Sequence, residues 1–219
     1  MKQIDIEKWA RKSHYNWFSK FANPTVALDF KLDVTNLLKY CETRKLSSFS
    51  ILMYAVCKCV NRNEAMRLRI KNEKVYLIDA ANVAYTIMVN DHDFVNCRAR
   101  TCLGLKVFLQ DVEDNRQRYC NSNYIQEEYN DTSVVDDVYC SCLPWLSFLS
   151  VAQPIPDNDN SSKSIPRLCW CKYYEENKRV YTTFNITVNH ALVDGIDLAL
   201  VCNDIQQTIN NLDKCLEDK

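Results

Sequence analysis

Residues 180–211, VYTTFNITVNHALVDGIDLALVCNDIQQTINN, contain a strand pattern, a short turn and a helix pattern in succession. Apolar and polar residues alternate in the first part, which predicts a strand with one buried face. From Ile196 onward, apolar residues recur at helical spacing and predict an amphipathic helix. The turn between these two elements holds His190, Asp194 and Gly195, and is therefore a candidate place for chemistry.

Glycine is scarce in this chain, since Gly104 and Gly195 are its only two. We therefore expect Gly195 to be needed where a side chain would clash or where φ must be positive. A lone histidine at a strand end is more often structural than catalytic, and an Asp-Gly pair is usually only a turn. On these residues alone the structural interpretation is favoured.

Size and composition indicate an ordinary globular protein. The length of 219 residues suits one domain, and 47% apolar with 25% charged residues is typical of a folded chain. The formal net charge of −1 gives no overall attraction to nucleic acid or to an anionic membrane, so we expect neither as a partner. There is no apolar run of membrane-spanning length, and the N-terminus lacks the apolar core of a signal peptide. We therefore expect a cytoplasmic protein.

The twelve cysteines raise the question of a metal site or disulfides. Six of them form C-x-C pairs, no C-x-x-C pair occurs, and no histidine follows at zinc-finger spacing. We therefore expect no metal, no structural disulfide and cysteines that act as small apolar core residues. The pairs are Cys57 with Cys59, Cys140 with Cys142, and Cys169 with Cys171.

The remaining periodicities predict a mixed sheet with helices, in a single α+β or α/β domain over residues 1–219. The predicted helices are a short one in the first half of 5–21 begun by Asp5, then 35–44, a longer one after the cap at Ser47 and Ser48, and 104–129. The predicted strands are 25–34, 67–70, 75–78, 83–89, one from Phe94 after a turn at 90–93, and the pair 167–174 and 180–188 around a turn at 175–178. Loops are predicted at 131–137 and 154–166.

Several further segments occur in a recognisable order along the chain. They are WARKSHYNWF at 9–18, LDVT at 32–35, YAV at 54–56 near Asn61, RLRI at 67–70, SCLPW at 141–145, Lys172-Tyr173, and NHALVDG at 189–195. In this order and spacing the chain resembles the chloramphenicol acetyltransferases nearly from end to end. The resemblance implies an α/β (α+β two-layer sandwich) fold, a mixed sheet flanked by helices. It also implies acetyl transfer from acetyl-CoA, as co-substrate and with no bound cofactor, to a small hydroxyl acceptor in a homotrimer with active sites at the subunit interfaces.

The resemblance implies two catalytic residues. His190 matches the general base that takes the acceptor hydroxyl's proton during attack on the thioester. The family implies that its ring is held partly by the histidine's own backbone carbonyl. Ser141 matches the serine that donates a hydrogen bond to the tetrahedral oxyanion, and the alternative is a serine bonded to backbone in the tight segment before Pro144.

The resemblance assigns supporting roles to four other residues. Asp194 would pair with Arg11 and hold the turn that Gly195 completes, whereas the alternative makes the two charges separate surface groups. Tyr173 would lie near the adenine of the coenzyme, and its alternative is an ordinary strand tyrosine.

The chain departs from the family where the acceptor is expected to bind. Asn189 replaces the first of two family histidines, and Gln153 lies in the altered wall after the Pro-Trp segment. Several stacking surfaces are smaller or more polar here, and each lost aromatic contact would weaken a nitrophenyl acceptor by about 1 kcal/mol. We therefore expect an active acetyltransferase whose acceptor is chloramphenicol or a related small hydroxyl compound, with the altered pocket favouring an acceptor other than chloramphenicol. The predicted acceptor pocket consists of Phe18, Val26, Phe94, Asn96, Val151 and Cys169.

Two other interpretations are open. The acyltransferase core of a 2-oxoacid dehydrogenase shares the His-x-x-x-Asp-Gly motif, but a lipoyl domain and long linker are expected ahead of such a core. A non-catalytic trimeric binding protein with the same fold is the second, and the intact His190, Ser141, Asp194 and Arg11 argue against it.

Overall fold

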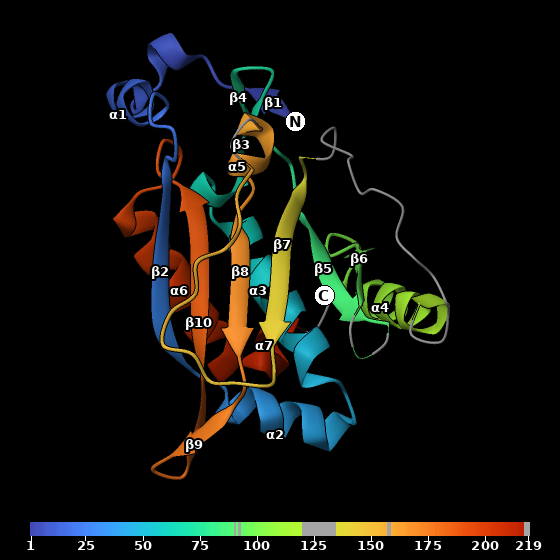
Figure 1. The fold of residues 1–219 in the computed structure, drawn as a ribbon. Helices are drawn as coiled ribbons and strands as arrows, with labels where there is room; N and C mark the ends of the chain where they lie inside the picture. The colour runs from blue at the N-terminus through green and yellow to red at the C-terminus, as the bar shows by residue number, and fades with distance from the viewer. Residues whose placement is uncertain (90, 92, 120–134, 157–158, 217–219) are drawn as a thin grey trace.

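A mixed sheet of seven strands forms the centre of the computed structural model, which describes residues 1–89, 91, 93–119, 135–156 and 159–216. The strand order is β2-β10-β8-β7-β5-β6, and β9 pairs with β10 (Figure 1). β7 runs parallel to β5 and β8, while the other neighbouring strands are antiparallel. A small second sheet has the order β1-β4-β3. The predicted α+β fold with a mixed sheet is therefore confirmed.

The described residues form the following elements in chain order. The strands are β1 Lys2–Gln3, β2 Thr25–Asp33, β3 Leu68–Lys71, β4 Lys74–Leu77, β5 Asn82–Met88, β6 Phe94–Ala99, β7 Asp137–Leu143, β8 Arg167–Cys171, β9 Tyr174–Glu176 and β10 Arg179–Asn189. The helices are η1 Ile6–Lys8, α1 Lys12–Phe18, α2 Thr35–Arg44, α3 Ser48–Arg62, η2 Ala65–Arg67, α4 Leu105–Tyr119, α5 Asn160–Lys163, α6 Gly195–Asn210 and α7 Leu212–Leu216.

The two faces of the large sheet are covered differently. Helices α3 and α6 lie behind it in Figure 1, and the chain after β7 crosses its front as an extended segment. Along β10, the alternate residues Phe184, Ile186 and Val188 join the hydrophobic core, so they face the helices. Asn185 and Thr187 therefore point to the other face, because successive strand residues alternate. The front face of β10 is therefore polar, and in the described part of the chain it is crossed by the extended segment after β7 (Figure 1).

Local signals predicted several helices and strands well. Helix α2 has the predicted bounds Thr35–Arg44, and α3 begins after Ser47, whose side chain accepts a hydrogen bond from the N–H of Ser50. Asp5 likewise caps η1 by accepting from Glu7. These outcomes follow from capping groups and apolar periodicity, which act within a few residues.

The predicted turn at 175–178 is wrong by two residues. Glu176 pairs with Arg179, so β9 takes up the first half of that segment and the turn consists of Asn177 and Lys178. These two residues have φ of 51° and 63°. A two-residue hairpin whose residues both have positive φ matches the right-handed twist of its strands, which explains the tighter turn.

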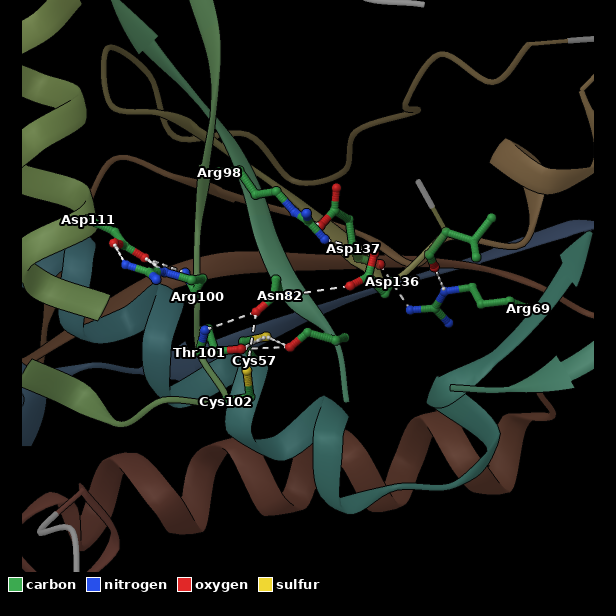
Figure 2. Close-up of polar contacts among 12 residues, drawn as sticks. Cys57, Arg69, Asn82, Arg98, Arg100, Thr101, Cys102, Asp111, Asp136 and Asp137 are labelled. Carbon is green, nitrogen blue, oxygen red and sulfur yellow. Dashed lines mark hydrogen bonds and ion pairs between the residues drawn. The ribbon is translucent and has the colours of Figure 1, made fainter. Parts of the chain in front are cut away.

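A polar network fixes the beginning of β7, the strand that carries Ser141 (Figure 2). Arg98 donates to the carboxylates of Asp136 and Asp137 at 2.7 and 2.6 Å. Arg69 is fully buried and donates to the carbonyls of Val135 and Asp137 at 2.8 and 2.9 Å. Burial lowers the pKa of Arg69 to about 10. The network joins β7 to β3 and β6, so the start of β7 is tied to both.

Some predictions fall partly outside the described residues. These are the turn at 90–93, the second half of the helix predicted at 104–129, most of the loop at 131–137, and two residues of the loop at 154–166. Among the residues described, no helix is both long and apolar enough to cross a membrane. None of the cysteines in the described ranges forms a disulfide.

Candidate functional site

His190 follows the last residue of β10, and its backbone is held from two sides. Its N–H donates to the carbonyl of Pro24 at 2.7 Å, and its own carbonyl accepts from Nη2 of Arg11 at 2.8 Å. These bonds connect the turn after β10 to the chain before β2 and to the segment before α1. The backbone of His190 is therefore fixed by contacts that are distant in sequence.

The His190 ring is positioned by a carbonyl and by an aromatic face. Nδ1 lies 3.1 Å from the carbonyl oxygen of Val193, and the ring stacks on Phe18 with centroids 4.1 Å apart. A carbonyl oxygen only accepts, so this contact favours the tautomer with a proton on Nδ1 and a lone pair on Nε2. The ring thus contacts the carbonyl of Val193 and not, as expected, its own carbonyl, which accepts from Arg11.

Arg11 and Asp194 form the ion pair that the resemblance implied, across 183 residues of sequence. Nη1 and Nη2 of Arg11 donate to the two carboxylate oxygens, the second bond at 2.9 Å, while Nε donates to the carbonyl of Ala191 at 3.3 Å. The two side chains are 15% and 30% exposed. The hydrogen bond from Arg11 lowers the pKa of Asp194. The pair thus holds both ends of the turn that carries His190.

Gly195 does not have the role predicted from its scarcity. A Cβ added there would meet nothing within 4 Å, and its φ is not positive, whereas Gly104 has φ of 90°. Gly195 is simply the first residue of α6, and Asp194 precedes it as the N-cap. The backbone N–H of Asp194 donates to Asp197 at 3.0 Å, so the helix start is stabilised by side chains without a steric need for glycine.

Asn189 has a local structural function at the same turn. It is 3% exposed, and its side-chain oxygen accepts from the N–H of Ala191 at 2.9 Å. Its backbone carbonyl accepts from Val193 at 3.0 Å. An asparagine at this position closes the turn through its own amide, which a sequence comparison alone did not indicate.

Ser141 lies in β7 on the wall between two cavities. Both cavities are lined by Ser141 and Thr86, and their volumes are about 810 and 600 Å³. The Ser141 hydroxyl makes no hydrogen bond to any residue the structure describes. The alternative in which this serine is bonded to backbone is therefore not found within the described chain.

The two proposed catalytic residues lie far apart in one chain. Ser141 is in register with Cys169, and Cys169 with Asn185, which precedes His190 by five residues along β10. The offset is about 16 Å along the strands and about 10 Å across them, or about 19 Å in all. Hydrogen-bonded catalytic groups are about 3 Å apart. A single copy of the chain therefore does not bring both groups to one reacting atom.

The residues of the predicted acceptor pocket are divided between these two places. Phe18 lies on the His190 ring, while Phe94 lines the larger cavity and Asn96 the smaller one, both beside Ser141. Val26 packs against the hydrophobic core next to Val188.

Two other predicted pocket residues lie on the front of the sheet. Cys169 is 3% exposed and belongs to the lining of neither cavity beside Ser141. The carbonyl of Val151 accepts from Nδ2 of Asn185 at 3.2 Å, so its backbone is part of a polar contact that sequence reasoning missed.

Tyr173 lines the larger cavity together with Lys172, Trp145 and Ser48. Burial raises the pKa of Tyr173 to about 12, so its hydroxyl stays neutral at ordinary pH. The cavity thus combines aromatic faces with one cation near its rim.

A buried polar cluster on the front face joins the sheet to the segment after β7. Asn185 is fully buried, and its amide donates to Asp29 at 2.9 Å while its oxygen accepts from Gln153 at 2.9 Å and from Thr187 at 3.1 Å. Gln153 lines the smaller cavity. Alternation of residues along β10 could have identified Asn185 and Thr187 as a polar face.

Arg167 is a further functional candidate that sequence reasoning missed. It begins β8, is 6% exposed and lines the smaller cavity. Burial lowers its pKa, against the opposing influence of Tyr139 and Asp159. The sequence did hold a signal for it, namely a charged residue at the start of an otherwise apolar strand. In the described part of the chain there is no cluster of three or more histidines, cysteines or carboxylates that could hold a metal ion.

Comparisons with known proteins relate the chain to one family along most of its length. The family model described as "Chloramphenicol acetyltransferase" matches residues 1–206. A chloramphenicol acetyltransferase of Clostridium perfringens is 26% identical over 215 residues, covering 95% of this chain and 98% of that protein. One from Proteus mirabilis is 25% identical over 206 residues, covering 93% and 92%.

Solved structures show the same fold. A chloramphenicol acetyltransferase structure matches with a TM-score of 0.85 and 22% identity, covering 95% of this chain and all of that one. The cubic core of the pyruvate dehydrogenase multienzyme complex matches with a TM-score of 0.65 and 11% identity, covering 93% and 88%. The chain therefore has the fold of a chloramphenicol acetyltransferase, and the core of a pyruvate dehydrogenase complex has a similar fold.

Proposed function

The chain belongs to the chloramphenicol acetyltransferase family and is an acetyltransferase, and from this premise we propose that it moves the acetyl group of acetyl-CoA to a hydroxyl of chloramphenicol or a related small acceptor. Residues 1–219 act as one catalytic domain with His190 as the general base. The observation that carries this assignment is the contact of Nδ1 of His190 with the carbonyl of Val193. The cytoplasmic location stays a prediction from the sequence.

His190 acts through its second nitrogen. With the proton on Nδ1, the lone pair on Nε2 takes the proton of the acceptor hydroxyl while the oxygen attacks the thioester carbonyl. Collapse of the tetrahedral intermediate breaks the carbon–sulfur bond, and the imidazolium returns the proton to the leaving thiolate. The stack on Phe18 and the Val193 contact hold the ring in place during both transfers. Such a base contributes roughly two to four orders of magnitude in rate.

Arg11 and Asp194 have a positioning role. Arg11 donates to the carboxylate of Asp194 and to the carbonyls of His190 and Ala191, so it ties the backbone of the base to the start of α6. Neither side chain needs to touch the acceptor for this purpose. The role of Gly195 is limited to beginning α6, since no steric requirement exists there within one chain.

Ser141 donates to the oxyanion from another copy of the chain. The separation of about 19 Å between Ser141 and His190 within one chain excludes their direct cooperation there. A cyclic homotrimer, in which each protomer contacts the next, would supply His190 from one copy and Ser141 from its neighbour.

The larger cavity is the proposed site of acetyl-CoA. It extends from Ser141 to Tyr173 and Lys172, so a long, narrow ligand could lie with its thioester at the serine. The ring of Tyr173 would contact the adenine, and the ammonium of Lys172 would attract phosphate oxygens. The smaller cavity, on the other side of Ser141, is left for the acceptor.

The proposal is tested by the release of free thiol from acetyl-CoA with a panel of hydroxyl acceptors. We expect turnover by the wild type and a loss of about two to four orders of magnitude in kcat for His190→Gln. His14→Gln is the matched control, because His14 is exposed and lies in the neighbouring helix α1. Turnover that survives in His190→Gln would contradict the role of the base. Binding of acceptors without any turnover would favour the non-catalytic alternative.

A further inference from the structure

The smaller cavity beside Ser141 contains a buried cation. Arg167 is 6% exposed, and among the carboxylates in the described residues none lies within ion-pair distance of it. Asp159 acts on it only over a longer distance. A guanidinium removed from water without an ionised partner is costly, and a ligand that supplies one would be stabilised there.

The hydrogen bonds of Arg167 leave one edge of its guanidinium open. Nη1 donates to the carbonyls of Ser162 and Ile165 at 2.9 and 3.1 Å, and Nη2 donates to the hydroxyl of Ser162 at 2.9 Å. Of its five N–H groups, the one on Nε and one on Nη2 find no acceptor among the described residues. In the described chain, Arg167 Nε does not belong to the fully buried side-chain atoms that lack a hydrogen-bond partner. A ligand in the cavity can therefore reach it. This adjacent pair is the fork that binds a carboxylate with two parallel hydrogen bonds.

Arg167 and Ser141 lie on the same face of the sheet. Tyr139 is in register with Arg167, and Ser141 with Cys169, in the parallel pair β7–β8. Ser141 is therefore displaced from Arg167 by two residues along the strand direction and by one strand across the sheet. These displacements put their Cα atoms about 8 Å apart. The guanidinium lies 5.2 Å from the ring of Tyr139, which fixes its direction on this face.

Given the acetyl transfer proposed above, on which this assignment rests, we propose that the acceptor is a small hydroxy acid whose carboxylate binds the open edge of Arg167 while its hydroxyl lies at Ser141. The linker between the hydroxyl and the carboxylate would reach from Ser141 to the guanidinium of Arg167 within the same cavity. The cavity walls between them include aromatic and aliphatic side chains that suit a flat or apolar linker. These walls are Tyr85, Tyr139, Pro154, Ile155 and Pro156.

The polar groups around the linker agree with a charged acceptor. Asn96 and Gln153 also line the cavity, where they replace apolar surface with amide groups. A neutral acceptor would leave the charge of Arg167 buried and unpaired, which lowers its affinity relative to a carboxylate. Chloramphenicol carries no carboxylate, so it is expected to be a poor acceptor.

The test compares 4-(hydroxymethyl)benzoate with 4-(hydroxymethyl)benzamide as acceptors, with chloramphenicol as a third. We expect the wild type to favour the carboxylate over the amide by about 10- to 100-fold in kcat/KM, as a paired charge-assisted hydrogen bond implies. Arg167→Met should remove this preference, because kcat/KM should fall for the benzoate and stay unchanged for the benzamide. Arg167→Lys, which keeps the charge but not the fork, should retain part of it.

Several outcomes would overturn the assignment. Equal kcat/KM for the benzoate and the benzamide in the wild type would do so, as would an equal loss of both in Arg167→Met with unchanged Tm. If Arg167→Met does not fold, the kcat/KM preference of the wild type and that of Arg167→Lys still test the assignment. If no acceptor is acetylated, acetyl transfer itself fails, and calorimetric binding of the benzoate against the benzamide then tests the carboxylate site independently.

Discussion

The ion pair between Arg11 and Asp194 gives the most quantitative prediction for this fold. Arg11→Met removes four hydrogen bonds, two to Asp194 and one each to the carbonyls of His190 and Ala191. Removing one partner of a buried pair costs about 3–5 kcal/mol, and exposures of 15% and 30% favour the lower end, about 3 kcal/mol. For a chain of this size each kcal/mol lowers Tm by about 2–4 °C, so the expected drop is about 6–12 °C.

The assay is thermal unfolding at one fixed protein concentration, because assembly makes Tm depend on concentration. Arg44→Met is a matched control, since Arg44 and Asp213 form a pair that is 41% and 67% exposed. An exposed pair contributes at most about 1 kcal/mol, so Tm should fall by no more than about 4 °C. The double variant with Asp194→Asn should be more stable than the sum of the two single changes predicts.

Two results would refute this reasoning. If Arg11→Met lowers Tm no more than Arg44→Met, the pair does not hold the turn. If the effects of Arg11→Met and Asp194→Asn simply add, the two groups are not coupled, and the support of His190 must come from elsewhere.

Three other predictions concern acid stability, the aromatic contact and the thiols. Because Arg11 lowers the pKa of Asp194 below its ordinary 3.8, the pair's stabilisation is present above that value and lost as pH falls through the folded pKa. Unfolding midpoints measured from pH 7 down to about pH 2 should therefore fall more steeply for the wild type than for Asp194→Asn, and parallel curves would contradict this. Because the Phe18 ring stacks on His190, Phe18→Ala should reduce stability by about 1 kcal/mol and also lower kcat. Phe18→Leu should have smaller effects on both quantities. An unchanged kcat in Phe18→Ala would exclude a positioning role for the ring. In thiol titration of the native protein, Cys102→Ser should remove a fast-reacting thiol, because Cys102 is exposed. Cys57→Ser should leave the fast-reacting thiols unchanged, because burial raises the pKa of Cys57 to about 12. The opposite order would show that burial does not govern thiol reactivity here.

Short-range features of the fold were predictable from the sequence. The bounds of α2 and the cap at Ser47 follow from periodicity and from side chains that bond within one turn of helix. The contact of Arg11 with Asp194 joins segments that are 183 residues apart, and only the resemblance to a family indicated it. Sequence spacing carries no information about such a pair.

The errors have physical reasons of the same kind. The His190 ring contacts the carbonyl of Val193, whereas the carbonyl that was expected to hold it accepts from Arg11. Gly195 was assigned a steric need from its scarcity, but α6 begins there with free space around the position. Both details depend on the path of the backbone through the turn, which residue types alone do not determine.

The division of the candidate site between two places also depends on strand register. The separation of His190 and Ser141 follows only when β7, β8 and β10 are aligned. Arg167 becomes a candidate for the same reason, since its register with Tyr139 brings it to the face that carries Ser141. A one-residue shift of β8 would turn Arg167 away, so neither conclusion was accessible from local patterns.

The central claim is that an acetyl-transfer site combines His190 of one copy with Ser141 of another. The most direct test is to prepare His190→Ala and Ser141→Ala chains, co-refold them in equal amounts and measure thiol release from acetyl-CoA. In a cyclic trimer with random mixing, each site takes one group from each of two neighbours, so about one quarter of the sites would have both groups intact. We predict recovery of about one quarter of wild-type activity in the mixture. Activity no higher than the sum of the separately refolded variants would contradict the claim.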